Sequence, residues 1–327
     1  MQDNNPNDYP YSQPLQPRQV EPKKPSALAA VCWTLLYALI FFIIQATVLL
    51  IFVAGTAFQQ VFLAINTGEL NPDDSAAVSV LVEDLVAGVL ATTLPWAMLI
   101  SGIITVILCW LIIRKRGFNA KAFASLNPVK PSVVIIALIL GASFSLALNA
   151  LFNIPGLEFL QDYETSLAQQ LLFGSILTAI VGSTIVPVVE EILFRGFILN
   201  ELRRSFTLLP SVLFSSLLFG ILHGTAAWAL MAATLGLLLT WIALRARSVY
   251  PAITAHMGIN GASFALVWSG VNNPTAFYAM LVGGGALFLF CMFLLINKTQ
   301  SLKDLEPAPE PLPEEPYTPW QNTDNNN

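Results

Sequence analysis

Two glutamates, an arginine and the only two histidines of the chain interrupt sequence that is otherwise strongly apolar. Glu190, Glu191 and Arg195 lie in P-V-V-E-E-I-L-F-R, His223 follows F-G-I-L, and His256 opens H-M-G-I-N. Carboxylate and imidazole groups are the side chains that most often move protons in hydrolysis. Since ionisable residues are costly in apolar helices, each of these residues is a candidate for function.

Helical spacing separates the roles of the two glutamates. Glu191 and Arg195 are four residues apart, so they lie on one face of a helix and can form an ion pair. Glu190 is turned roughly 100° away from that face, since a helix turns once in 3.6 residues. The pattern therefore predicts that Glu190 lacks this partner and is available as a general base.

The two histidine segments are predicted to reach the same level as the glutamates. Glu190 and His223 are almost equally far along the chain from Phe206, which lies near a predicted turn between two antiparallel helices. A second turn near Ser248 and Val249 brings His256 close to the same level. Asn260 lies four residues after His256, and Phe219 lies four residues before His223. Since residues four apart share one helix face, both side chains should point into the same cavity as the histidines.

Composition shows what kind of elements must hold these residues. The 327 residues are 55% hydrophobic and 11% charged, with a mean hydropathy of +0.67. Soluble domains have about a quarter charged residues. Several apolar stretches reach the roughly 20 residues needed to cross a bilayer, where backbone groups must be paired internally. We therefore expect an all-α polytopic membrane protein with about eight transmembrane helices around a cavity.

The predicted spans leave polar segments at both ends of the chain. The spans are 28–54, 95–113, 132–153, 170–200, 208–224, 228–244, 250–269 and 277–297. Residues 76–94 are predicted to form an amphipathic helix on the membrane or a partial span. We expect a disordered N-terminal tail over 1–26, a transmembrane domain over 27–297 with its motif-bearing core at 170–270, and a disordered Pro/Glu-rich tail over 298–327.

Basic residues predict the orientation in the membrane. With eight spans and both termini in the cytoplasm, every Lys and Arg except Arg195 falls on the cytoplasmic side, while the opposite segments carry acidic residues. No basic cluster suited to nucleic acid is present. Cys32, Cys109 and Cys291 are dispersed without metal-ligand spacing and are expected to be small buried apolar residues.

Each polar residue also has a purely structural interpretation. Glu191 with Arg195 is compatible with an ordinary helix end, and a single histidine or Asn260 with a hydrogen bond between helices. Ser215 and Ser216 are expected to pack rather than to act as nucleophiles, because no G-x-S-x-G motif surrounds them. The presence of both histidines and an unpaired glutamate at one level favours catalysis.

These segments resemble the CPBP family of CAAX prenyl endopeptidases and bacteriocin-processing proteins. The shared patterns are E-E-x-x-x-R from Glu190, F-x-x-x-H from Phe219, and H-x-x-x-N from His256. The resemblance implies an eight-helix intramembrane glutamic protease in a bacterial plasma (inner) membrane, acting on a membrane-anchored protein or peptide. It does not fix whether that substrate is prenylated.

The resemblance also implies a role for each matching residue. Glu190 would be the general base with His223 as its partner, and both would activate the attacking water. His256 and Asn260 would stabilise the oxyanion. Glu191 and Arg195 would orient the motif helix, as supporting residues.

Three alternatives remain open at this point. One Glu and two His could ligate zinc, although H-E-x-x-H is absent and no cofactor is otherwise expected. Intramembrane Glu and His could relay protons in a transporter. A non-catalytic immunity or scaffold protein could also retain this family's fold.

Overall fold

The computed structural model describes residues 25–68, 75–153, 176–223, 226–271 and 273–305, and within these ranges every regular element is a helix. The all-α prediction is therefore confirmed. The predicted polar tails at 1–26 and 298–327 lie largely outside the described residues.

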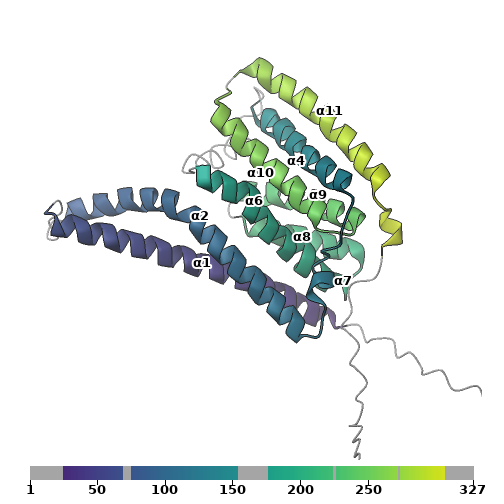
Figure 1. Ribbon diagram of the computed structural model, residues 1–327, viewed down its shortest axis with the longest axis horizontal. Helices are drawn as coiled ribbons and strands as arrows, with labels where there is room; N and C mark the ends of the chain where they lie inside the picture. Colours follow the sequence, from purple (N-terminus) through teal and green to yellow (C-terminus); the bar gives the residue numbers. More distant parts are fainter. Residues whose placement is uncertain (1–24, 69–74, 154–175, 224–225, 272, 306–327) are drawn as a thin grey trace, which may run out of the picture.

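Two long helices form a hairpin that projects to one side of the molecule (Figure 1). Helix α1 spans Ala27–Asn66 and packs along α2, which spans Ser75–Lys115. The side chain of Ser26 accepts a hydrogen bond from the backbone of Ala29 and caps α1. Helix α1 contains the predicted span 28–54 and continues beyond it, and residues 76–94 form the first half of α2, which continues through Pro95.

The remaining long helices make up the other part of the bundle (Figure 1). They are α4 (Pro131–Phe152), α6 (Ile176–Glu191), α8 (Leu208–Ile221), α9 (Ala226–Ala246), α10 (Tyr250–Ser269) and α11 (Pro274–Lys298). Helix α10 packs against both α4 and α6. Gly141 and Gly258 make the α4 contact possible, because an added Cβ at either would overlap a backbone carbonyl oxygen of the facing helix. This close packing fixes the position of α10, which carries His256 and Asn260.

The helix that carries the glutamates changes its winding beside them. Helix α6 contains Pro187, which cannot donate a backbone hydrogen bond, and is followed by the π-helical segment η2 (Ile192–Ile198) and by α7 (Leu199–Arg203). Ser215 donates to the Phe194 carbonyl at 3.2 Å, so its hydroxyl serves the backbone of this widened segment. π-Helical turns occur frequently at functional sites.

The predicted spans can be compared with the helices that are long and apolar enough to cross a membrane. Within the described residues, each of the eight predicted ranges falls on helix apart from a few end residues, and six helices are long and apolar enough to span a membrane. Helix α8 has 14 residues and is too short, and α10 is not among the six. The predicted turns are confirmed, since Thr207 precedes α8 and Val249 precedes α10.

A cluster around Glu201 ties the hairpin to α7. The buried carboxylate of Glu201 accepts two hydrogen bonds from Arg116, at 2.7 and 3.0 Å, and one from Arg204 at 3.0 Å. Arg116 also donates to the Tyr37 hydroxyl at 2.6 Å and lies 3.9 Å from the Trp33 ring centre. Burial alone would lower the pKa of Arg116, but its hydrogen bonds and charge attraction to Glu201 outweigh that effect and raise the pKa.

The chain after α11 folds back onto the end of α9. Arg245 donates to the Thr299 hydroxyl at 3.0 Å, and the Gln300 backbone donates to the Arg245 carbonyl at 3.1 Å. Arg247 donates to the carbonyl oxygen of Asp304, the last residue of the short helix η3 (Leu302–Asp304). The described chain therefore keeps contacts with the helical bundle after Lys298, as far as Asp304.

Candidate active site

Glu191 lies at the centre of a buried charged cluster. Its Oε1 atom accepts a hydrogen bond from Arg195 Nη1 at 2.8 Å and lies 3.0 Å from His256 Nδ1. The side chains of Glu191 and Arg195 are 0% and 1% exposed, so this ion pair is sealed from solvent. The Glu191–Arg195 pair predicted from helical spacing is therefore present. A buried pair of this kind is sensitive to the loss of either partner.

Glu190 occupies a different environment from its neighbour. Its side chain is 13% exposed, and its Oε2 lies 3.8 Å from Nε2 of His256. That separation is too long for a direct hydrogen bond, but it is a separation that one water molecule can bridge. The two adjacent carboxylates thus differ: Glu191 is enclosed by Arg195 and His256, and Glu190 is the more exposed of the two.

The contacts of His256 assign its two ring nitrogens. An ionised carboxylate only accepts hydrogen bonds, so the Nδ1–H of His256 donates to Glu191. The other nitrogen, Nε2, is then directed towards Glu190. Glu191 therefore holds the imidazole in an orientation that presents Nε2 to the more accessible carboxylate.

Phe219 connects both histidines to the charged cluster. Its ring, which is fully buried, lies 4.4 Å from the His223 ring and 6.1 Å from the His256 ring, between centroids. Arg195 stacks over the same ring at 4.3 Å, a favourable contact between a cation and an aromatic face. Phe219 therefore contacts three of the predicted site residues, which are His223, His256 and Arg195.

His223 lies just beyond the end of α8 and is half-buried. Its Nδ1 is 2.6 Å from the carbonyl oxygen of Phe219, which can only accept, so Nδ1 carries the proton of this bond. In the neutral ring, Nε2 then has a free lone pair. Among the contacts of the described residues, His223 and Glu190 are not joined by a direct hydrogen bond or ion pair.

Asn260, in α10, is hydrogen-bonded to α6, the helix that carries the glutamates. Its Nδ2 donates to the carbonyl oxygen of Gly182 in α6 at 2.9 Å, which uses one of its two amide hydrogens. Sequence reasoning missed this acceptor and the Gly236 carbonyl, which accepts from Arg195 at 3.3 Å. Both are backbone oxygens, and no residue type marks a backbone acceptor in a sequence.

Two polar atoms of the cluster have no hydrogen-bond partner. They are Oε2 of Glu191 and Nε of Arg195, and both are buried. Over the described ranges, no set of three or more His, Cys, Asp or Glu side chains is arranged to hold a metal ion.

The segment that carries all of these residues matches a known family. Residues 171–262 match the family model described as type II CAAX prenyl endopeptidase Rce1-like. The predicted family resemblance is confirmed over this segment. Glu190, His223, His256 and Asn260 all fall inside the matched residues.

A curated relative supports the same class of protein. The Bacillus subtilis protein with the description "Putative membrane peptidase YdiL" is 31% identical over 84 residues, which are 26% of this chain and 34% of the relative. The match thus spans about a third of the relative's length. No solved structure matches the chain significantly. Together with the apolar helices, these matches support a membrane protein of the peptidase class.

Proposed function

We propose that this protein is an intramembrane endopeptidase that hydrolyses a peptide bond of a membrane-associated substrate with water activated by Glu190. The observation that carries the proposal is the unequal exposure of two adjacent carboxylates beside one histidine. Glu191 is sealed and ion-paired, while Glu190 is 13% exposed and faces His256 Nε2. A catalytic base must be accessible to water and substrate, and its orienting partners must be fixed.

In the proposed reaction, Glu190 removes a proton from a water molecule while the oxygen of that water attacks the scissile carbonyl carbon. The same proton is then given to the leaving amine when the C–N bond breaks. The lone pair on Nε2 of His223, which the bond to the Phe219 carbonyl leaves free in the neutral ring, is suited to accept a hydrogen bond from that water. This hydrolysis needs no reactant other than water and the peptide substrate.

The negative charge that develops on the carbonyl oxygen needs hydrogen-bond donors. Asn260 keeps a second amide hydrogen after its bond to Gly182, and His256 can donate from Nε2 when that nitrogen is protonated. Donors held in place before the reaction stabilise such a charge by roughly 3 kcal/mol each. Glu191 and Arg195 act through His256, as positioning residues.

The proposal is tested by comparing wild type with Glu190→Gln in nanodiscs, on membrane-anchored peptides selected from membrane proteomics of cells that express each form. We expect fragments only with the wild type. Asp304→Asn is the matched control, since it removes an exposed carboxylate outside the site. Cleavage by Glu190→Gln at the wild-type rate would refute the role of Glu190. Loss of activity with a chelator, followed by recovery with zinc, would favour the metal alternative.

A further inference from the structure

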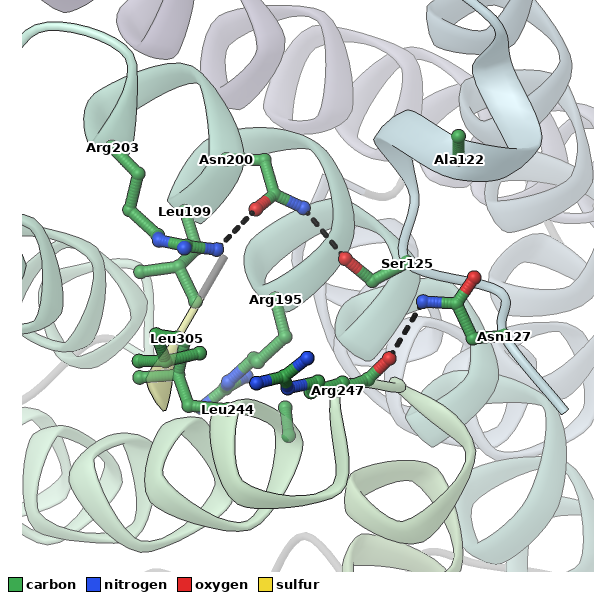
Figure 2. Close-up of a pocket in the computed structure, with 11 residues that line it drawn as sticks. Ala122, Ser125, Asn127, Arg195, Leu199, Asn200, Arg203, Leu244, Arg247 and Leu305 are labelled. Carbon is green, nitrogen blue, oxygen red and sulfur yellow. Dashed lines mark hydrogen bonds between the residues drawn. The ribbon is translucent and has the colours of Figure 1, made fainter. Parts of the chain in front are cut away.

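A polar pocket lies beside Arg195, at the basic ends of the helices. It is a cavity of about 270 Å³ between η2, α7, the α3 region (α3, Ala120–Phe123) and the α9–α10 turn (Figure 2). Its polar lining is contributed by Ser125, Asn127, Arg195, Asn200, Arg203 and Arg247. We refer to this cavity as the arginine pocket.

The lining of the arginine pocket is cationic. Three guanidinium groups, from Arg195, Arg203 and Arg247, border the cavity, and none of the described residues that line it is acidic. Arg195 is 1% exposed, and its Nε has no hydrogen-bond partner. A buried donor without a partner is costly, so a ligand oxygen at this position would restore a hydrogen bond.

The polar groups around the cavity are held in place by hydrogen bonds to one another and to the backbone. Asn200 donates to the Ser125 hydroxyl at 2.8 Å and accepts from Arg203 at 3.1 Å, while Asn127 donates to the Arg247 carbonyl at 2.7 Å (Figure 2). Ser125 and Arg247 have φ angles of 52° and 51°, and in the described chain they are the non-glycine residues with positive φ. Such backbone conformations cost of order 1–3 kcal/mol and persist where the surroundings impose them.

The position of the pocket relative to the membrane indicates which anion is nearby. Arg203 ends the candidate span Ile176–Arg203, and Arg247 directly follows the end of the span Trp228–Ala246. The ends of spans lie at the level of the lipid headgroups. Arg is also the side chain best suited to bind phosphate oxygens, through its fork of N–H donors.

We propose that the arginine pocket binds a phosphate group, supplied either by a phospholipid headgroup or by a free phosphate. Arg203 and Arg247 would contact its oxygens from opposite elements, and Nε of Arg195 would supply a further donor. Leu199, Leu244 and Leu305 add apolar surface to the lining, which can contact the apolar carbons that adjoin the phosphate of a lipid. The inference does not depend on the proposed peptidase activity.

The test uses the full chain. Inorganic phosphate is titrated calorimetrically into the detergent-solubilised protein, and native mass spectrometry measures phosphatidylglycerol retained from nanodiscs that mix it with phosphatidylcholine. We expect Arg203→Gln/Arg247→Gln to lose about tenfold or more in phosphate affinity or in lipid retention, since charge-assisted hydrogen bonds are lost. Leu305→Glu, which adds a negative charge at the rim, should have the same effect if the double variant fails to fold.

Arg114→Gln is the matched control, because it removes an exposed positive charge near the same membrane surface outside the pocket. Loss of lipid retention alone identifies a headgroup as the ligand, and loss of calorimetric binding alone identifies free phosphate. The proposal is overturned if the wild type binds neither probe. It is equally overturned if Arg114→Gln is affected as strongly as the pocket variants.

Discussion

Nδ1 of His256 lies 3.0 Å from Oε1 of Glu191, the same oxygen that accepts a hydrogen bond from Arg195. One buried carboxylate oxygen therefore fixes both a cation and an imidazole from another helix. Glu191 and Arg195 should therefore matter mainly for folding, whereas the more exposed Glu190 should matter mainly for chemistry.

Glu191→Gln should destabilise the protein by about 3–5 kcal/mol, because it leaves Arg195 charged and unpaired at 1% exposure. Glu190→Gln should change stability by less than about 1 kcal/mol, since its side chain reaches solvent. Thermal unfolding in detergent measures both. The assignment is reversed if Glu190→Gln unfolds the protein while Glu191→Gln is stable and inactive.

Asn260→Ala should slow turnover by about a hundredfold or more with little change in substrate binding, if its free amide hydrogen stabilises the oxyanion. The lost bond to Gly182 should also cost about 1 kcal/mol of stability. Separate measurement of kcat and KM distinguishes the two effects. A stability loss without any change in kcat would assign Asn260 a purely structural role.

Phe219→Ala should destabilise the protein by about 3–5 kcal/mol, because its fully buried ring leaves a cavity beside Arg195 and both histidines. Phe219→Leu should be more stable than Phe219→Ala, yet it should still lower kcat, since the flat surface that the His223 ring packs against is lost. Ser215→Ala is a useful comparison, because its hydroxyl serves only the backbone at Phe194. Full kcat in Phe219→Leu would limit the ring to packing.

Glu201→Gln should destabilise the contact between the hairpin and α7 by about 3–5 kcal/mol, since two partly buried arginines lose their shared carboxylate. Tyr37→Phe removes a single hydrogen bond to Arg116 and should cost only about 1 kcal/mol. Hydrogen exchange of α1 reports the loosening. Equal protection of α1 in wild type and Glu201→Gln would show that apolar packing alone holds the hairpin.

A reporter inserted after Gly68 should lie across the membrane from reporters at either terminus. This follows from the distribution of Lys and Arg, which the sequence concentrates at one set of helix ends. Gly68 is an exposed position with φ 75°, where an insertion should be tolerated. Reporters on the same side at Gly68 and at the C-terminus would refute the orientation.

Side-chain periodicity was enough to predict the ion pair and the helical elements. Glu191 and Arg195 are neighbours on one helix, so their contact depends only on local geometry. The turns before α8 and α10 were also predicted, because polar residues interrupt long apolar stretches there.

The contacts between helices were harder to predict. The approach of His256 to Glu191 depends on how α10 is rotated against α6, and glycine contacts with α4 set that rotation. The arginine pocket depends on positive φ angles at Ser125 and Arg247, residues that do not usually mark such a conformation. Helix α1 also continues past residue 54, the end of the predicted span, to Asn66.

The length of the hairpin sets how far its tip lies from the basic surface. Helix α1 has 40 residues and is about 60 Å long, roughly twice the hydrocarbon thickness, whereas α10 has 20 residues and is about 30 Å long. Even at a tilt of about 40°, the upper end for membrane helices, roughly a third of α1 lies outside the hydrocarbon. Arg116 holds the other end at the basic surface, so the excess length, with Phe58 and Phe62 exposed, extends on the far side. The hairpin therefore projects farther from the basic surface than α10 does, so its exposed phenylalanines lie at or beyond the opposite headgroup level.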